Sequence, residues 1–156
     1  QNDAALDNLL SQLKQRQAEL AQKHGRYVPL TLKIAPDLDA QQIQQISDAL
    51  KRYQMDGVIA TNTTLSREGV EGLTHAEESG GLSGAPLRVR STQVVQQLAD
   101  KLAGEVPIIA VGGIMNGDDA LAKINAGAAL VQIYSGLIFN GPAMVRECVL
   151  RLNKAV

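Results

Sequence analysis

The chain has 156 residues, a length typical of one compact domain, and its net charge of −1 gives no reason to expect a nucleic acid or an acidic surface as a partner. Aromatic residues make up 3% of the chain and Trp is absent, so the stacking platforms of a single-stranded nucleic-acid binder are missing. The apolar runs are too short to span a membrane, no signal peptide is visible, and the one cysteine excludes an internal disulfide framework, so we expect a cytoplasmic α/β chain.

The first predicted element is an amphipathic helix over about residues 3–23, where leucines recur at helical spacing. GRYVPLTLKIAPD then predicts a strand between its two prolines. A second helix follows, with Asp37 or Asp39 as its N-cap. Its buried stripe is formed by Ile43, Ile46, Leu50 and Tyr53. DGVIATN, at residues 56–62, predicts a second and buried strand.

Residues 62–84 interrupt this rhythm with five glycines and little periodicity, and a loop of that length inside a compact domain is usually functional. A third helix begins near Pro86, and VPIIAVGG predicts a third strand. A fourth helix runs from an Asn116 N-cap to Gly127, followed by a fourth strand in AALVQIYSG. Pro142 begins the last helix. Its apolar side comprises Val145, Cys148, Val149 and Leu152.

These elements predict a single domain over residues 1–156, with a leading helix in 1–24 and strand–helix units in 28–152. Continuous apolar strands that are each followed by a helix indicate a parallel sheet covered by helices. Two α/β architectures fit: an open doubly wound sheet, or half of a (β/α)8 TIM barrel, which typically needs about 250 residues. The chain begins on a helix with no strand before it, as expected of a cut made inside a longer chain.

The third and fourth strands end in small residues, Gly112-Gly113 and Tyr134-Ser135-Gly136. Both architectures gather active groups at the carboxyl ends of the strands. Glycine lets the backbone approach a ligand closely and leaves its N–H groups free to face phosphate oxygens. In barrels, phosphate commonly lies between the loops after the last two strands. The pattern therefore predicts a phosphate pocket, with a short extra helix after Gly136, while the alternative is two tight turns without a ligand.

Two polar features precede this pocket in the sequence. Lys33 lies within the apolar strand LTLKIAP, and a buried ammonium group needs an anion or water. It either faces an electron-accepting ring at the mouth of a barrel or points outward into solvent. ATNTT places four hydrogen-bonding side chains, Thr61 to Thr64, at the end of the second strand. Asn62 offers a donor and an acceptor to a planar ligand, whereas an Asx or Ser/Thr turn is the alternative.

Other reactive side chains give weaker signals. His24 and His75 have no partners at metal-ligand spacing, so no metal site is expected. Cys148 falls on the apolar stripe of the last helix, which favours a place in the core over a role as nucleophile. Asp118 and Asp119 are typical first-turn acids of a helix and do not indicate a catalytic pair.

The chain carries five longer motifs in order: LKIAPDL, DGVIATNTT, GGLSGAPL, IIAVGGI and LVQIYSGLIF. In these motifs it resembles the membrane-associated, quinone-linked class (class 2) of dihydroorotate dehydrogenases over about residues 28–152. The glycine pair alone fits many families of phosphate-binding barrels, but APDL together with ATNTT and GGLSG sharply narrows the number of families that fit. The resemblance implies a (β/α)8 barrel with FMN at its mouth, to which this chain gives strands five to eight. It also implies oxidation of dihydroorotate to orotate in pyrimidine synthesis, with quinone reoxidising the flavin.

The resemblance also implies roles for single residues. Lys33 contacts the polar edge of the flavin, Thr61 and Asn62 line the flavin, and Asn62 with Thr63 holds the orotate ring. The backbones of Gly112, Gly113 and Gly84 approach FMN, and the backbone N–H groups of Tyr134 and Ser135 hold its phosphate.

The rest of the machinery is implied to lie upstream of Gln1. In this family the catalytic base is a serine after the fourth strand, and no serine of this chain matches its position. The N-terminal half of the barrel and the segment that meets quinone at the cytoplasmic side of the inner membrane are expected there too, so this chain alone should be inactive. Two alternatives remain: a non-catalytic half-barrel that binds phosphate, or another FMN or sugar-phosphate barrel enzyme.

Overall fold

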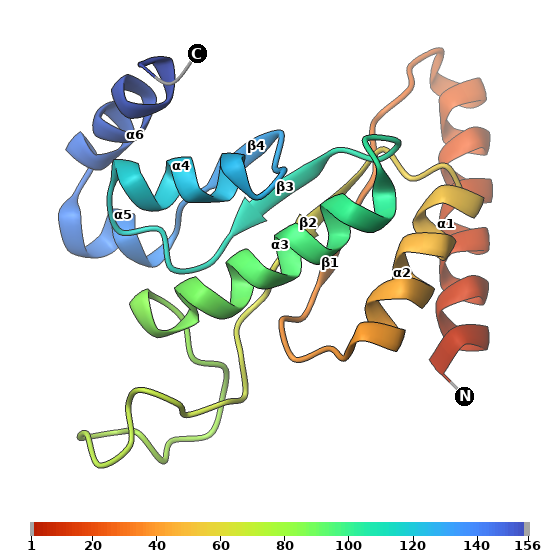
Figure 1. The fold of residues 1–156 in the computed structure, drawn as a ribbon. Coiled ribbons are helices and arrows are strands. Elements are labelled where there is room, and N and C mark those ends of the chain that lie inside the picture. Colours follow the sequence, from red (N-terminus) through yellow and green to blue (C-terminus); the bar gives the residue numbers. More distant parts are fainter. Residues whose placement is uncertain (1, 155–156) are drawn as a thin grey trace.

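A computed structural model describes residues 2–154 of the chain (Figure 1). Four parallel strands form one sheet: β1 Thr31–Ile34, β2 Gly57–Ala60, β3 Ile108–Val111 and β4 Leu130–Gln132. The helices are α1 Asn2–His24, α2 Ala40–Arg52, α3 Arg88–Leu102, α4 Gly117–Asn125, α5 Ser135–Asn140 and α6 Ala143–Asn153, and a 3-10 turn, η1 Ala85–Leu87, precedes α3. The predicted domain also included residues 1, 155 and 156, which lie outside the described residues.

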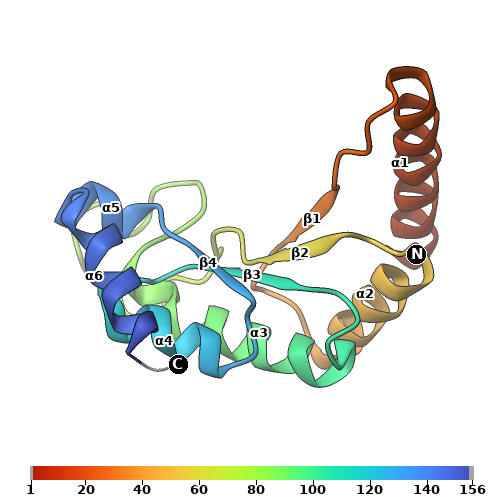
Figure 2. The same ribbon diagram turned by 90° about the horizontal axis from the view of Figure 1, so that it is seen from above.

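The order of the strands decides between the two predicted architectures. The sheet runs β1-β2-β3-β4 in sequence order, and α2, α3 and α4 all lie on the same side of it (Figure 2). A doubly wound sheet reverses its strand order at a switch point and carries helices on both faces. The chain therefore forms half of a (β/α)8 barrel, with helices outside and an open inner face.

The hydrophobic core lies between the sheet and these helices. Alternate strand residues point toward the helices because side chains alternate along a strand. This buried set includes Ile34, Val58, Ala60, Ile108 and Ala110 on the strands and Ile43, Leu50, Val94, Val95 and Leu98 on the helices. The remaining strand positions occupy the inner face, where the register aligns Lys33, Ile59, Ile109 and Leu130 in one row. The inner face is thus the surface that leads to the strand ends.

Of the two aspartates predicted as possible N-caps of α2, one caps the helix and the other binds the loop after β2. Asp39 is the N-cap, because its Oδ1 accepts from the Gln42 N–H at 2.8 Å while the Gln42 side chain accepts from the Asp39 N–H at 2.9 Å. Asp37 instead accepts from the Thr64 hydroxyl at 2.6 Å and from the Leu65 N–H at 2.8 Å. The loop after β1 is therefore tied to the loop after β2.

The glycine-rich segment after β2 is a loop, as predicted, and it is closed at its base. The backbones of Thr64 and Leu82 pair as an isolated antiparallel bridge, with N–H to carbonyl distances of 3.0 and 2.7 Å. Inside the loop, the Arg67 guanidinium donates to the carbonyls of Glu78 and Gly80 at 2.7 and 2.8 Å. The loop extends away from the sheet (Figure 1).

The predicted apolar side of the last helix was partly wrong. Val145 and Val149 are 47% and 50% exposed, whereas Met144 and Cys148 are buried against Ile114. Helix α6 packs mainly on α4, so only a narrow stripe of residues four apart is covered. None of the helices in residues 2–154 is both long and apolar enough to cross a membrane.

Candidate functional site

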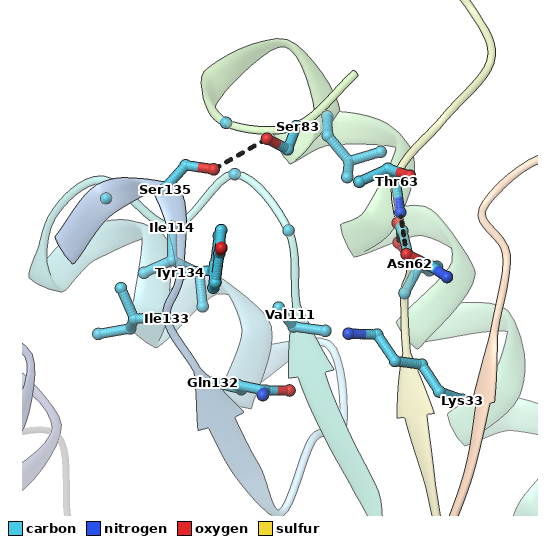
Figure 3. Close-up of a pocket in the computed structure, with 16 residues that line it drawn as sticks. Lys33, Asn62, Thr63, Ser83, Val111, Ile114, Gln132, Ile133, Tyr134 and Ser135 are labelled. Atoms are coloured by element: carbon cyan, nitrogen blue, oxygen red, sulfur yellow. Dashed lines mark hydrogen bonds between the residues drawn. The ribbon is translucent and has the colours of Figure 1, made fainter. Parts of the chain in front are cut away.

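A cavity of about 270 Å³ lies at the carboxyl ends of the four strands (Figure 3). Its walls come from the ends of all four strands and from the segment that leads into η1. The lining includes every residue predicted for the cofactor and substrate: Lys33, Thr61, Asn62, Thr63, Gly84, Gly112, Gly113, Tyr134 and Ser135. Residues as far apart in the sequence as Lys33 and Ser135 thus meet at one site, because parallel strands end at the same edge of a sheet.

Lys33 occupies the inner face of β1. It aligns with Ile59 in the register, and its side chain extends across β2 toward Val111 at the end of β3 (Figure 3). The Lys33 ammonium group makes no hydrogen bond and no ion pair with any residue from 2 to 154. It therefore places a positive charge at the cavity without a protein partner, and the alternative of a lysine that points away from the site does not describe this structure.

The polar residues after β2 form the predicted local turn, and three of them line the cavity. Thr61 is buried, and its hydroxyl donates to the carbonyl of Asn62 at 2.8 Å. The side-chain oxygen of Asn62 accepts from the Thr63 N–H at 2.8 Å, so Asn62 does form a local turn. Its amide nitrogen has no partner among the described residues and stays available to a ligand. Thr64 is the exception, because it binds Asp37 and does not line the cavity.

Glycine is required where β3 ends. Gly112 and Gly113 have φ values of +115° and +73°, a region that residues with a Cβ rarely adopt. A Cβ on Gly113 would also overlap the backbone of Arg88 at the start of α3, and a Cβ on Gly136 would overlap the carbonyl of Ile114. The two strand-end loops are thus packed closely against their neighbours by their backbones.

These loops leave backbone donors unused at the cavity wall. The N–H groups of Gly113, Ser135 and Gly136 donate no hydrogen bond to any described residue. Converging free N–H groups on close backbone turns are a common way to bind an anion. The short helix α5 that follows is the extra helix predicted from the sequence.

Several cavity residues were not anticipated from the sequence. The hydroxyls of Ser83 and Ser135 lie 3.0 Å apart and link the segment before η1 to α5 (Figure 3). Val111 and Gln132 are paired in the register and line the floor. Leu87, Ile114 and Ile133 complete the apolar part. The strand-end rule could have identified Val111 and Gln132, because they are the last residues of β3 and β4.

A buried lysine behind the glycine pair was also missed. Lys123 of α4 is 0% exposed, and its ammonium group donates to the Ser91 hydroxyl at 2.5 Å, the Thr92 hydroxyl at 2.7 Å and the Arg88 carbonyl at 3.1 Å. Burial lowers the pKa of Lys123 to about 8; nearby Asp119 acts to raise it, and Arg88 lowers it further. All three ammonium hydrogens have an acceptor, which offsets part of the cost of burial.

The side chains that gave weak signals have structural partners. Asp119 pairs with Arg88 at 3.0 Å and Asp118 with Arg151 at 2.6 Å, so these two acids do not form a catalytic pair. Cys148 is buried, and desolvation raises the pKa of its thiol. Within residues 2–154, no three His, Cys, Asp or Glu side chains converge in a way that could hold a metal ion.

Comparisons with known proteins agree on one family. The sequence model described as dihydroorotate dehydrogenase matches residues 1–156. Dihydroorotate dehydrogenase (quinone) of Thiobacillus denitrificans is 65% identical over 152 residues, which cover 97% of this chain and 45% of that protein. The protein of the same name from Cupriavidus necator is 63% identical over 153 residues, with 98% and 44% covered.

A solved structure gives the same result at the level of the fold. The crystal structure of DHODH in complex with ferulenol from Eimeria tenella superposes with a TM-score of 0.90 at 32% identity, covering 98% of this chain and 45% of that one. The chain therefore spans slightly less than half the length of the relatives that it matches.

Proposed function

The chain belongs to the dihydroorotate dehydrogenase family, and on that premise we propose that it is the FMN-binding half of a quinone-linked dihydroorotate dehydrogenase. The complete protein would oxidise dihydroorotate to orotate in pyrimidine synthesis and pass the electrons to a quinone. The observation that carries this proposal is the cavity at the strand ends, which has an unpaired ammonium group at one wall and free backbone N–H groups at another.

The residues of the cavity fit FMN at both of its ends. The free N–H groups of Gly113, Ser135 and Gly136 suit the terminal phosphate, because they supply donors without a competing protein acceptor. Gly84 and Gly112 line the same cavity, where their backbones could approach the rest of the cofactor closely. When bound, FMN supplies a ring that accepts a hydride from the substrate.

Lys33 would stabilise negative charge at the polar edge of the ring. A positive charge fixed before the reaction costs no reorganisation when the charge of the ring changes, and it acts more strongly where water is excluded. The amide of Asn62 and the hydroxyl of Thr63 would orient the orotate ring, since one offers both donor and acceptor and the other can adapt its hydroxyl. The Thr61 hydroxyl donates to the backbone carbonyl of Asn62 and would fix the backbone there, while the Thr63 N–H, which donates to the side-chain oxygen of Asn62, would hold the amide in place.

The proton acceptor would come from residues upstream of this chain. Ser83 and Ser135 are the serines that line the cavity, and their hydroxyls bind each other. Neither has a neighbouring base among the described residues, so we assign neither as the catalytic base. The upstream half would also close the open inner face and provide the contact with quinone, as a peripheral protein on the cytoplasmic side of the inner membrane.

A chimaeric barrel tests this proposal. The N-terminal half of the Thiobacillus denitrificans relative is joined ahead of this chain, and bound flavin and dihydroorotate oxidation with a soluble quinone are measured by absorbance. We expect the chimaera to bind FMN and turn over, and the 156-residue chain alone to be inactive. Turnover by the chain alone would overturn the assignment of the base to the upstream half, and a chimaera that folds without binding flavin would overturn the assignment of the cofactor.

A Lys33→Met variant of the chimaera tests the role of the lysine. Because the charge is removed at the ring and the N–H groups at the phosphate are untouched, flavin reduction should slow by at least about 100-fold, a magnitude common for groups that stabilise developing charge. The dissociation constant of FMN should change much less. Stopped-flow flavin bleaching and fluorescence titration measure the two quantities, and equal losses would contradict the electronic role of Lys33.

The second candidate function is a non-catalytic half-barrel that binds phosphate. The open inner face and the unpaired edges of β1 and β4 favour association, because unpaired edge strands readily pair with another chain. Sedimentation of the chain alone, with flavin fluorescence, separates the two: a stable monomer that binds phosphate and not FMN would favour this second candidate.

A further inference from the structure

Behind the glycine pair, a chain of hydrogen bonds connects α4 to the cavity wall. The Lys123 ammonium group donates to the Ser91 hydroxyl at 2.5 Å. The single hydrogen of that hydroxyl has two acceptors within reach, the Gly112 carbonyl at 2.9 Å and the Arg88 carbonyl at 3.1 Å, and the contact to Gly112 is the shorter one. Lys123 is fully buried, and Ser91 is too. Neither residue lines the cavity. Their link to the cavity runs through Gly112, which does line it.

The contact between Ser91 and the Gly112 carbonyl also fixes the direction of the Gly113 N–H. In a planar trans peptide, the carbonyl of one residue and the N–H of the next point in opposite directions. Because the Gly112 carbonyl is held toward Ser91, the N–H of Gly113 points away from Ser91 and α3. Gly113 lines the cavity, and its N–H has no partner among the described residues. With φ at +115° and +73°, the glycine pair has few backbone restraints of its own, so an external hold on this peptide matters.

We propose that Lys123 is a positioning residue of the phosphate site, and that it acts through Ser91 and the Gly112 carbonyl to aim the Gly113 N–H at the anion. Both of its other acceptors, on Arg88 and Thr92, lie near the start of α3, so the ammonium also fixes this end of the helix against the loop. An ammonium donor polarises the Ser91 hydroxyl and strengthens the bond that it makes to Gly112. The proposal rests on the proposed function for the identity of the ligand, the phosphate of FMN.

Asp119 supports the same arrangement from one helical turn earlier. Its carboxylate accepts from the Met115 N–H at 3.0 Å and pairs with Arg88 at 3.0 Å. Residues 119 and 123 lie on one face of α4, because positions four apart are neighbours on a helix. This face therefore holds both the loop after β3 and the start of α3.

The test compares FMN with riboflavin, which lacks the phosphate, in the chimaeric barrel. Ser91→Ala breaks the link to Gly112, and Lys123→Met removes the ammonium at similar volume. Thr92→Val is the matched control, because it removes a bond of 2.7 Å to Lys123 that does not lead to Gly112. We expect Ser91→Ala and Lys123→Met each to reduce the preference for FMN over riboflavin about tenfold, and Thr92→Val to preserve it. The double variant should lose no more than either single one, since both break one chain of bonds.

A flavin-independent measurement separates this inference from the proposed function. Inorganic phosphate is titrated into the isotope-labelled chimaeric barrel, without flavin, and the amide signal of Gly113 is followed by NMR. In the wild type and Thr92→Val the signal should shift with phosphate, and in Ser91→Ala the shift should be lost or much reduced. If flavin does not bind but this pattern holds, the proposed cofactor is wrong and the positioning role stands. If the wild-type Gly113 signal ignores phosphate, or if all three variants weaken FMN and riboflavin equally, the positioning role is refuted.

Discussion

The buried charge of Lys123 predicts how stability depends on pH. In the folded chain the pKa of Lys123 is lowered from 10.5 to about 8. Between these values the unfolded chain binds more protons, so the free energy of unfolding rises with pH. Below about pH 8, burial of the charge costs about 3 kcal/mol, since each pH unit corresponds to about 1.36 kcal/mol. From about pH 7 to about pH 10, Lys123 should therefore add about 2.5 kcal/mol to stability.

The assay compares urea unfolding of wild type and Lys123→Met at several pH values. Lys123→Met also loses three hydrogen bonds, but that cost does not vary with pH. From about pH 7 to about pH 10, the free energy of unfolding of the wild type should therefore rise by about 2.5 kcal/mol relative to that of Lys123→Met. Lys101→Met, on the exposed surface of α3, controls for the loss of one positive charge. A difference that stays constant over this range would refute the assignment of a buried, charged lysine, and NMR titration of the lysine side chains would check the pKa of Lys123 directly.

Two further predictions concern the backbone and the core. Gly113→Ala should lower the free energy of unfolding by more than about 3 kcal/mol, because strain at positive φ adds to an overlap with Arg88. Gly104 also has a positive φ but has open space around it, so Gly104→Ala should cost only about 1 kcal/mol. Thermal or urea unfolding measures both. Leu98→Ala removes a fully buried side chain and should cost about 3 kcal/mol, while Val89→Ala, at an exposed position, should change stability by less than about 0.5 kcal/mol in the same assay.

The sequence was most informative where a local pattern has one physical solution. Apolar runs that end at proline, threonine or glycine predicted the four strands. The N-cap of α2 was predicted as Asp37 or Asp39, and the structure shows that it is Asp39, in a capping box with Gln42. The strand-end rule then brought Lys33 and Asn62 to the same cavity as the glycine pair. Each of these inferences needs only neighbours in the sequence or a general rule of parallel sheets.

Contacts between distant elements could not be predicted in this way. A lysine in the last turn of α4 is favoured there by the helix dipole and is usually solvated, so the sequence gives no sign that Lys123 is buried under α3. Val145 and Val149 have the spacing of a core stripe, yet the rotation of α6 on α4 places Met144 and Cys148 inward. Both outcomes depend on how two helices meet, which periodicity within one helix does not specify.

The bridge between Thr64 and Leu82 makes the glycine-rich loop a separable module of the chain. Its two ends are joined before it leaves the sheet, so a change in its length need not be transmitted to the strands. A Cβ added at Gly69 or Gly72 would meet nothing within 4 Å. For protein engineering, this loop is therefore the place to insert a reporter sequence or to open a circularly permuted barrel while the cavity at the strand ends keeps its shape.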